Sequence, residues 1–135
     1  MLNVVGAVLV SGQDVYIFKR ADTLKSMPGY YEFPGGKVEL NEGFKDALVR
    51  ELNEELNILV DRNLIEDFPN NIFKNDKLLL ELYVVRHWEG EIRLDLGVHS
   101  TLDIIKIQNL SKVEDMLATD RALIPNILEY LNIKT

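Results

Sequence analysis

The stretch that decides the fold is FPGGKVELNEGFKDALVRELNEEL, residues 33–56. Its glycine pair, Gly35-Gly36, forms a bend whose backbone can approach another segment or a ligand closely. The residues that follow predict a helix over 42–56, with Asn41 as its N-cap and Asn57 closing it in the left-handed conformation. We expect the rest of the chain to be organised around this bend and helix.

One stripe of the predicted helix carries three carboxylates. Measured from Arg50 at 100° per residue, Glu54 lies at about 40° and Glu51 at about 100°. Glu55 follows at about 140°, next to an apolar face. That face is formed by Leu48, Val49, Leu52 and Leu56. Because like charges at these spacings repel one another, the stripe is either a solvated surface or a site for hard divalent cations such as Mg²⁺, which prefer oxygen ligands. Its position beside the core-facing side favours the cation site.

Apolar, β-branched segments on both sides of this stretch predict a sheet. Residues 2–10 are almost wholly apolar and predict a central strand that is buried on both faces. The turn at 11–14 joins them to a second strand at 15–19, so the two strands form a hairpin. Further extended segments are predicted at 30–33, 58–60, 77–88 and 101–107.

Two helical segments are predicted near the C-terminus. Ser111 to Glu114 has the capping-box pattern, which predicts a short helix to about Leu117. A last helix follows, with Pro125 in its first turn. Its buried side is formed by Ile127, Leu128 and Leu131. Strands mixed with a few helices indicate one layered α/β or α+β domain over residues 1–135.

The composition limits the function classes. With 135 residues, of which 47% are hydrophobic, the chain can bury one sizeable core but not two. It has no cysteine, which excludes disulfides and thiolate chemistry and suits a cytoplasmic location. A net charge of −7 disfavours binding to a nucleic-acid backbone. No apolar run predicts a membrane span, and the N-terminus lacks the pattern of a signal peptide.

The acidic stretch resembles the signature of a known family. The Nudix box of the Nudix hydrolases is similar to Gly36-x5-Glu42-x7-Arg50-Glu51-Leu52-x-Glu54-Glu55-x-Asn57-Ile58. The one departure is Asn57, where the family usually has glycine. Asparagine is the next-best residue for a left-handed helix end, so the departure is conservative. Residues 31–39 and the turn at 86–91 also resemble MutT-type and CTP-pyrophosphohydrolase-type members.

The resemblance implies an α/β/α sandwich with a mixed β-sheet and the cleavage of a nucleoside diphosphate linked to another group, with Mg²⁺ or Mn²⁺ as cofactor. Glu51, Glu54 and Glu55 match the metal-binding glutamates, and the Gly35 carbonyl matches a backbone ligand. Glu51 or Glu54 is also a candidate to deprotonate the attacking water. Arg50 matches an arginine that orients a box glutamate. Bound cations would explain how an acidic protein holds a polyanion.

Other residues match positions that contact the nucleotide in the family. Lys37 and Arg20 match phosphate-facing positions, with a simple surface charge as the alternative for Arg20. Asp120, expected just before the last helix, matches a residue that binds the base edge. The alternative for Asp120 is an acid that stabilises a helix N-terminus. Aromatic candidates for stacking on the base are Tyr31, Phe33 and Phe73, with core packing as the alternative for Phe33.

One acid that the resemblance implies is absent. MutT-like relatives usually have a further glutamate in the loop after the turn at 86–91, often just before a histidine, as a metal ligand or base. This chain has Asp95 and His99 in that region. Either Asp95 or His99 takes the role, or the role is empty, and a histidine in a loop is more often structural.

The leading hypothesis is a Mg²⁺-dependent nucleoside triphosphate pyrophosphohydrolase that releases a monophosphate and pyrophosphate. Its substrate would be an oxidised or modified nucleotide, such as 8-oxo-dGTP, or a cytidine nucleotide. One alternative is hydrolysis of a nucleotide sugar, ADP-ribose or a dinucleoside polyphosphate. Another is a non-catalytic domain that binds a nucleotide and regulates a partner. Because dimers are common in the family, a homodimer is a candidate assembly.

Overall fold

Strand β1 (Leu2–Ser11) lies at the centre of a mixed seven-stranded sheet. It pairs in parallel with β6 (Leu78–Val85) and antiparallel with β2 (Asp14–Arg20). The outer strands are β5 (Ile72–Lys74), which pairs with β6, and β7 (His99–Lys106), which pairs with β2. The computed structural model describes residues 1–132, so the last three residues of the predicted domain, 133–135, lie outside the described part.

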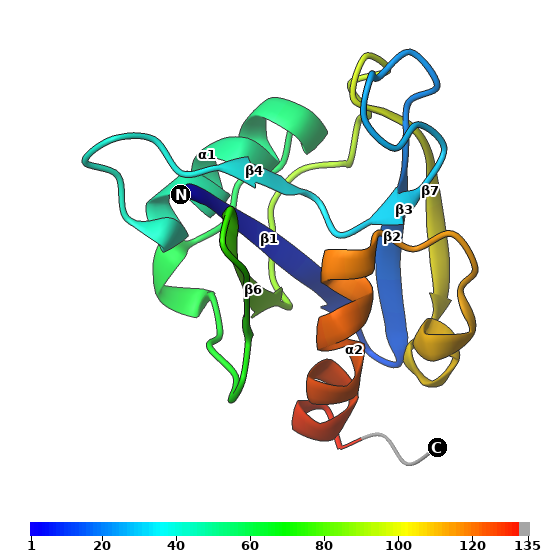
Figure 1. Cartoon of the computed structure of the whole chain (residues 1–135). Coiled ribbons are helices and arrows are strands. Elements are labelled where there is room, and N and C mark those ends of the chain that lie inside the picture. The colour runs from blue at the N-terminus through cyan, green and yellow to red at the C-terminus, as the bar shows by residue number, and fades with distance from the viewer. Residues whose placement is uncertain (133–135) are drawn as a thin grey trace.

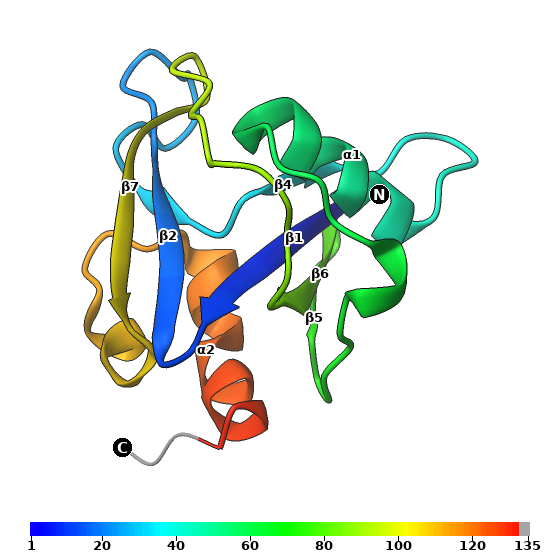
Figure 2. The same cartoon turned by 180° about the vertical axis from the view of Figure 1, so that it is seen from behind.

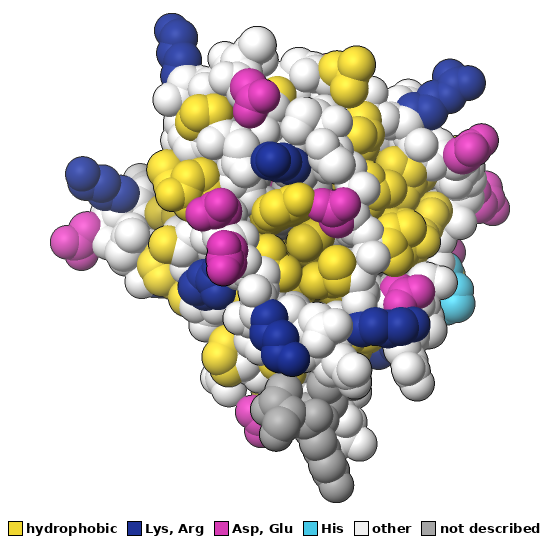
Figure 3. Space-filling model, turned by 90° about the vertical axis from the view of Figure 1, so that its right-hand side faces the viewer, with side chains coloured by type: hydrophobic (Ala, Val, Ile, Leu, Met, Phe, Trp, Pro, Cys, Tyr) yellow, Lys and Arg dark blue, Asp and Glu magenta, His cyan; other side chains and the backbone are white. Residues whose placement is uncertain are grey.

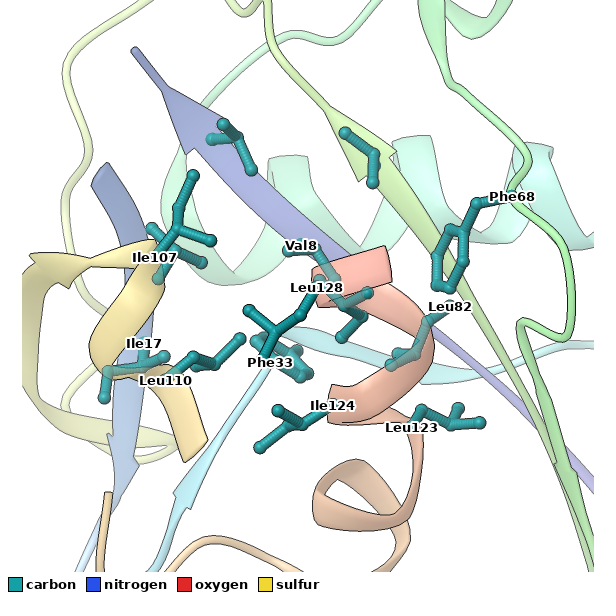
Figure 4. Packing of buried hydrophobic residues seen from close by; sticks show 14 of the residues in the cluster. Val8, Ile17, Phe33, Phe68, Leu82, Ile107, Leu110, Leu123, Ile124 and Leu128 are labelled. Atoms are coloured by element: carbon teal, nitrogen blue, oxygen red, sulfur yellow. The ribbon is translucent and has the colours of Figure 1, made fainter. Parts of the chain in front are cut away.

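Two helices cover the two faces of the sheet (Figures 1 and 2). Helix α1 (Phe44–Leu56) lies on one face and α2 (Ala118–Tyr130) lies on the other. Alternate β1 side chains enter the two cores: Val8 and Val10 pack on the α2 side, and Val5, Ala7 and Leu9 pack on the α1 side. Figure 4 shows the core on the α2 side. The strand is therefore buried on both faces as predicted, and the layers form the predicted α/β/α sandwich.

Strands β1 and β2 diverge, and the segment with the glycine pair fills the gap between them. Near the hairpin, Leu9–Ser11 pair with Asp14–Tyr16. Farther from the turn, β3 (Tyr31–Glu32) pairs with β2, and β4 (Gly35–Lys37) pairs with β1. The bend is thereby fixed against the central strand, on the side where α1 begins.

Helix α1 begins later than predicted. It starts at Phe44 with Gly43 as its N-cap, while Asn41 adopts a left-handed conformation with φ 65°. Glu42 stays outside the helix because its carboxylate accepts hydrogen bonds from Arg50 and from a preceding backbone N–H. The prediction that Asn41 caps the helix is therefore wrong.

The end of α1 is confirmed at Asn57, which is left-handed with φ 60° and donates its N–H to the Asn53 carbonyl. Its side chain donates to the Arg93 carbonyl at 3.2 Å. Replacing Asn57 by Ala is expected to destabilise the protein by about 1 kcal/mol, because a residue with a Cβ and no local hydrogen bond is strained there. Replacing it by Gly is expected to change the free energy of unfolding by less than about 0.5 kcal/mol. Urea denaturation of both variants tests this, and equal losses would contradict it.

The capping-box prediction is wrong. Ser111 lies within a short 3₁₀-helix, η2 (Ile107–Lys112), and the chain then extends toward β3. There the Tyr31 N–H donates to the Asp115 carbonyl, and the Leu117 N–H donates to the Tyr31 carbonyl. These bonds to a neighbouring strand replace the local helix that the sequence pattern predicts.

Helix α2 begins at Ala118, earlier than predicted. Pro125 therefore lies inside the helix rather than in its first turn, and Asp120 lies in the first turn rather than before it. An interior proline removes one helical hydrogen bond, so burial of the apolar side holds this helix. Its buried apolar residues are Leu123, Ile124, Ile127 and Leu128, with Leu131 packed at the edge of the core. Within residues 1–132, no helix is long and apolar enough to cross a lipid bilayer.

The chain after β6 crosses the α1 side of the molecule. The strand ends at Val85 rather than at 88, and the Trp88 ring then packs edge-on against Tyr16 at 5.4 Å between centroids. The short strands β4 and β5 and the 3₁₀-helix η1 (Arg62–Leu64) are not predicted from the sequence. Seen from the side nearest β7, the surface carries hydrophobic side chains among interspersed acidic and basic ones (Figure 3).

Candidate active site

The glycine pair of β4 packs against backbone on one side and against a carboxylate on the other. A Cβ at Gly35 would lie 1.9 Å from the Val5 carbonyl oxygen, so no side chain fits between β4 and β1. A Cβ at Gly36 would lie 2.4 Å from the carboxyl carbon of Glu51. The lack of side chains at both positions lets α1 bring Glu51 directly against the β4 backbone.

Arg50 binds several of the surrounding acids at once. Its Nε and Nη2 donate to the two carboxylate oxygens of Glu42, both at 2.9 Å. Its Nη1 donates to Glu51 at 2.9 Å and to Glu54 at 3.4 Å. Nη2 also donates to the Lys37 carbonyl at 3.0 Å, which ties α1 to β4. The hydrogen bonds from Arg50 to Glu42, followed by the one from the Glu39 N–H, hold the pKa of Glu42 down at about 2. The hydrogen bonds to Glu51 and Glu54 place Arg50 where it orients two of the three box glutamates.

Glu55 is the box carboxylate that lines the pocket, and one of its oxygens lacks a partner. Oε2 is buried and has no hydrogen-bond partner among residues 1–132. Burial, followed by the negative charges of Glu51 and Glu32, raises the pKa of Glu55 to about 9. Burial also raises the pKa of Glu51 despite its ion pair with Arg50. Two desolvated carboxylates, one of which has an oxygen without a partner, are hard donors that fit a divalent cation such as Mg²⁺.

The three box glutamates do not form a closed cation cage by themselves. In the described part of the chain, no group of three or more histidine, aspartate or glutamate side chains is arranged to hold a metal ion. Arg50 draws Glu51 and Glu54 to one side, while Glu55 lines the cavity. The oxygen donors are of the kind that a hard cation prefers. In this structure the Arg50 guanidinium supplies the positive charge beside Glu51 and Glu54.

A cavity of about 420 Å³ beside β4 joins the two ends of the predicted site. Its polar lining includes Arg20, Glu32, Glu55 and Asp120, together with the glycine pair. Its apolar lining includes Leu2, Val4, Phe33, Leu78, Leu80 and Leu117. The structure therefore brings a metal-binding candidate, a phosphate-binding candidate and a base-binding candidate to one cavity.

Asp120 lies in this cavity from the first turn of α2 and is only 5% exposed. Its Oδ2 accepts the Phe33 N–H at 3.1 Å. Burial raises the pKa of Asp120 to about 7, and the charge of Glu32 acts in the same direction. The Phe33 hydrogen bond and Arg20 oppose this shift. Asp120 therefore makes a structural hydrogen bond and also lies at the cavity wall, where its carboxyl group can bind a ligand.

Six predicted site residues do not line the cavity: Arg50, Glu51 and Glu54 of the box, and the nucleotide-contact candidates Lys37, Tyr31 and Phe73. The Tyr31 hydroxyl donates to Asp103 across the sheet, and the ring packs against the core. Phe73 also packs against that core from β5. Lys37 is exposed at the end of β4, directly after the glycine pair. The geometry gives the two aromatic rings packing roles and leaves Lys37 at the surface.

Glu32 is a cavity residue that sequence reasoning missed. It accepts from Arg20 Nη1 at 2.9 Å and contacts His99 Nε2 at 2.8 Å. In the sequence, the signal for this role is that Glu32 is a charged residue between the two aromatic residues Tyr31 and Phe33 of a short extended segment. On a strand, such a residue projects opposite to its neighbours, which here points it away from the ring of Tyr31.

The two candidates for the absent loop glutamate have different surroundings. Asp95 is exposed, and its Oδ1 accepts the Gly97 N–H at 3.0 Å, as in a side-chain-capped turn. His99 is completely buried at the start of β7 and faces Glu32. Neither residue lines the cavity.

Replacing Asp120 by Asn is expected to remove a pH dependence of stability. The folded pKa of about 7 exceeds the ordinary 3.8, so between these values the folded protein holds a proton that the unfolded chain has released. The free energy of unfolding of the wild type therefore falls as pH rises through that window. Asn does not titrate, and its carbonyl oxygen can still accept the Phe33 N–H. Relative to the variant, the free energy of unfolding of the wild type is expected to fall by up to about 1 kcal/mol for each unit of rising pH. Urea denaturation at about pH 4.5 and about pH 6.5 measures this, and a constant difference between the proteins would contradict it.

Comparisons with known proteins agree with the fold and the box. The model of the NUDIX domain matches residues 2–127. The 8-oxo-dGTP diphosphatase of Proteus vulgaris is 38% identical over 88 residues, which cover 64% of this chain and 77% of that protein. The CTP pyrophosphohydrolase of Escherichia coli (strain K12) is 41% identical over 58 residues, 43% of this chain and 42% of that protein. The crystal structure of a MutT protein from Methanosarcina mazei Go1 matches with a TM-score of 0.80 and 18% identity over 98% of this chain and 96% of that chain.

The family match spans the mixed sheet, the glycine pair and the whole acidic helix. The two relatives with similar sequences are named as a diphosphatase and a pyrophosphohydrolase, which are enzymes that hydrolyse phosphoanhydride bonds in nucleotides. The chain therefore belongs to the NUDIX family and is a hydrolase that acts on phosphoanhydride bonds.

Proposed function

We propose that the chain hydrolyses a nucleoside triphosphate to a nucleoside monophosphate and pyrophosphate in a Mg²⁺-dependent reaction. The observation that carries this proposal is the cavity that joins Glu55 and the glycine pair to Arg20 and Asp120. Its volume of about 420 Å³ lies within the range usual for small-molecule sites. The names of the relatives support a nucleoside triphosphate as the substrate.

The acidic end of the cavity supplies the hydrolytic chemistry. Glu51, Glu54, Glu55 and the Gly35 carbonyl would hold Mg²⁺, for which Mn²⁺ can substitute. When bound, the cation supplies neutralising charge for phosphoryl oxygens and acidifies water. Arg50 keeps Glu51 and Glu54 oriented through its Nη1. Of these two acids, Glu51 is the better base for the attacking water, because its desolvated carboxylate has a raised pKa.

The other end of the cavity binds the rest of the nucleotide. The Arg20 guanidinium uses three of its five N–H groups on Ser26 and Glu32, which leaves two for phosphate oxygens. Lys37 remains a second phosphate contact in this proposal, from the rim beyond the glycine pair. Asp120 accepts from an exocyclic amine on the base. Guanine, cytosine and adenine all carry such an amine, so this contact does not select one base. The names of the relatives favour an oxidised or modified nucleotide such as 8-oxo-dGTP, or a cytidine nucleotide, as the substrate.

A substrate panel in the presence of Mg²⁺ tests this proposal. It contains 8-oxo-dGTP, dGTP, CTP, dCTP, dTTP, ADP-ribose and a nucleotide sugar, and kcat/KM is measured for the wild type, Asp120→Asn and Asp120→Ala. We expect an amine-bearing triphosphate to be the best substrate and Asp120→Ala to reduce its preference over dTTP by about tenfold.

Two outcomes would overturn the proposal. A nucleotide sugar or ADP-ribose as the best substrate would show that the substrate class is wrong. Tight nucleotide binding without metal-dependent hydrolysis would favour the non-catalytic regulator, for which the absent loop glutamate is the supporting feature. A uniform effect of Asp120→Ala on all bases would reject the role of this residue in base recognition.

A further inference from the structure

A buried histidine and two charged side chains form a continuous set of contacts behind the cavity wall. His99 is 0% exposed, and its Nε2 lies 2.8 Å from Glu32 Oε2. The other oxygen of Glu32 accepts from Arg20 Nη1 at 2.9 Å. Arg20 is further held by two hydrogen bonds to the Ser26 carbonyl, at 2.8 and 3.2 Å. Arg20 and Glu32 line the cavity, whereas His99 lies behind them.

The surroundings of His99 assign the position of its proton. Nδ1 is buried and has no hydrogen-bond partner in the part of the chain that the structure describes. The ring packs against Phe18, with 5.3 Å between the ring centroids. A proton on Nδ1 would be a buried unpaired donor, which costs about 1–3 kcal/mol. The neutral ring therefore carries its proton on Nε2 and donates it to Glu32.

The Arg20–Glu32 pair lines the same cavity as Glu55 and Asp120. The charge of Glu32 contributes to the raised pKa of both Glu55 and Asp120, so it is close enough to influence each end. The positive charge of Arg20 acts in the opposite direction and lowers the pKa of Asp120. Because Arg20 and Glu32 share the cavity lining with Glu55 and Asp120, a nucleotide bound along this lining would meet both side chains.

We propose that His99 is a positioning residue for nucleotide binding, which fixes the Glu32 carboxylate and through it the Arg20 guanidinium at the cavity wall. His99 is not the base that replaces the absent loop glutamate, because it lies behind the cavity lining and its one engaged nitrogen faces Glu32. The nucleotide as ligand rests on the proposed function, whereas the histidine's contact with Glu32 does not.

Two histidine variants with opposite hydrogen-bonding capacity test the proposal. His99→Leu keeps an apolar side chain against Phe18 and removes the donor, while His99→Gln can place an amide N–H near the position of Nε2. The loss of a hydrogen bond to a charged group is expected to raise KM, and the Kd of Mg²⁺ complexes of α,β-methylene GTP and CTP, by about tenfold in His99→Leu. His99→Gln is expected to stay within about threefold of the wild type, and kcat is expected to change by less than about threefold in both.

A double-mutant cycle separates positioning from general stability. In an Arg20→Ala background, His99→Leu is expected to have little further effect on Kd, because its effect passes through Arg20. Glu32→Gln, which leaves His99 in place, is expected to weaken binding as His99→Leu does. This variant keeps the test valid if His99→Leu does not fold.

A spectroscopic readout tests the contact without turnover. Imidazole ¹⁵N spectra of the whole protein at about pH 8 are expected to show His99 as the Nε2–H tautomer. An Nδ1–H tautomer would overturn the proposal. Equal affinities of His99→Leu and the wild type, or an undiminished effect of His99→Leu in the Arg20→Ala background, would also overturn it. If the panel shows no triphosphate hydrolysis, the proposed function fails, while the tautomer and the affinities still decide the role of His99.

Discussion

Glu55→Gln is expected to lose nearly all hydrolysis and, at the same time, to stabilise the metal-free protein. The expected fall in kcat is on the order of 10²- to 10⁴-fold, because a cation held by oxygen donors contributes several kcal/mol to stabilisation of the transition state. The amide keeps the shape of the side chain but offers a neutral oxygen in place of the charged one. Initial rates at saturating Mg²⁺ measure this effect, with Glu114→Gln at an exposed position as the matched control.

The gain in stability follows from the burial of Glu55. Its pKa of about 9 lies above the ordinary 4.5, so between these values the folded state holds a proton that the unfolded chain has released. The free energy of unfolding of the metal-free wild type therefore falls as pH rises through this window. Gln does not titrate, so the variant is expected to gain about 1 kcal/mol for each pH unit above about 4.5, which amounts to several kcal/mol at pH 8, and nothing at pH 4. An activity loss that is accompanied by an equal loss of stability at both pH values would contradict this prediction.

Gly35→Ala and Gly36→Ala are expected to fail for different reasons, although the two residues are adjacent. The new Cβ at Gly35 would meet the Val5 carbonyl oxygen at 1.9 Å and the Gly6 Cα at 2.7 Å, both in the backbone of the central strand. This clash would push β4 away from β1, which is expected to lower the free energy of unfolding by about 3 kcal/mol or more. Thermal unfolding of this variant should show a large drop in Tm or no folded state.

The new Cβ at Gly36 would instead meet the end of the Glu51 side chain, at 2.4–2.6 Å. A side chain can move aside, so the fold is expected to remain within about 1 kcal/mol of the wild type. The displaced carboxylate would leave its place beside Arg50, with an expected loss of activity of about 100-fold. Gly43→Ala serves as the control, since its nearest neighbour is a flexible carboxylate of Asp46 at 3.2 Å. A Gly36→Ala variant that is fully active would contradict the placement of Glu51 in the site.

The elements that the sequence predicts well are those whose residue pattern is long and internally consistent. The continuous apolar run of β1 has few alternatives to a strand buried on both faces, and the apolar face of α1 repeats over several turns. The helix starts later than the pattern predicts because the Glu42 carboxylate accepts hydrogen bonds from Arg50 and from a backbone N–H outside the helix. That choice depends on a tertiary partner, so the local cap pattern at Asn41 gives no sign of it.

The errors in the second half of the chain have the same origin. The capping-box pattern at Ser111 is locally sound, but hydrogen bonds to β3 hold the following residues in an extended conformation. The directions of side chains on short strands are equally non-local. Tyr31 and Phe73 were predicted to meet the base and instead pack against the core, whereas Glu32 enters the cavity. Asp120 lies in the first turn of α2 rather than before it and lines the cavity, and its contact with the base stays a prediction.

Metal-dependent cleavage to a monophosphate is tested most directly by a ³¹P NMR time course of 8-oxo-dGTP and CTP with the wild-type protein, Mg²⁺ and then an excess of chelator. The expected products are a nucleoside monophosphate and pyrophosphate, their formation is expected to stop when the chelator is added, and Glu55→Gln is expected to form no products. A nucleoside diphosphate and orthophosphate as products, or hydrolysis that continues after the chelator, would contradict this expectation.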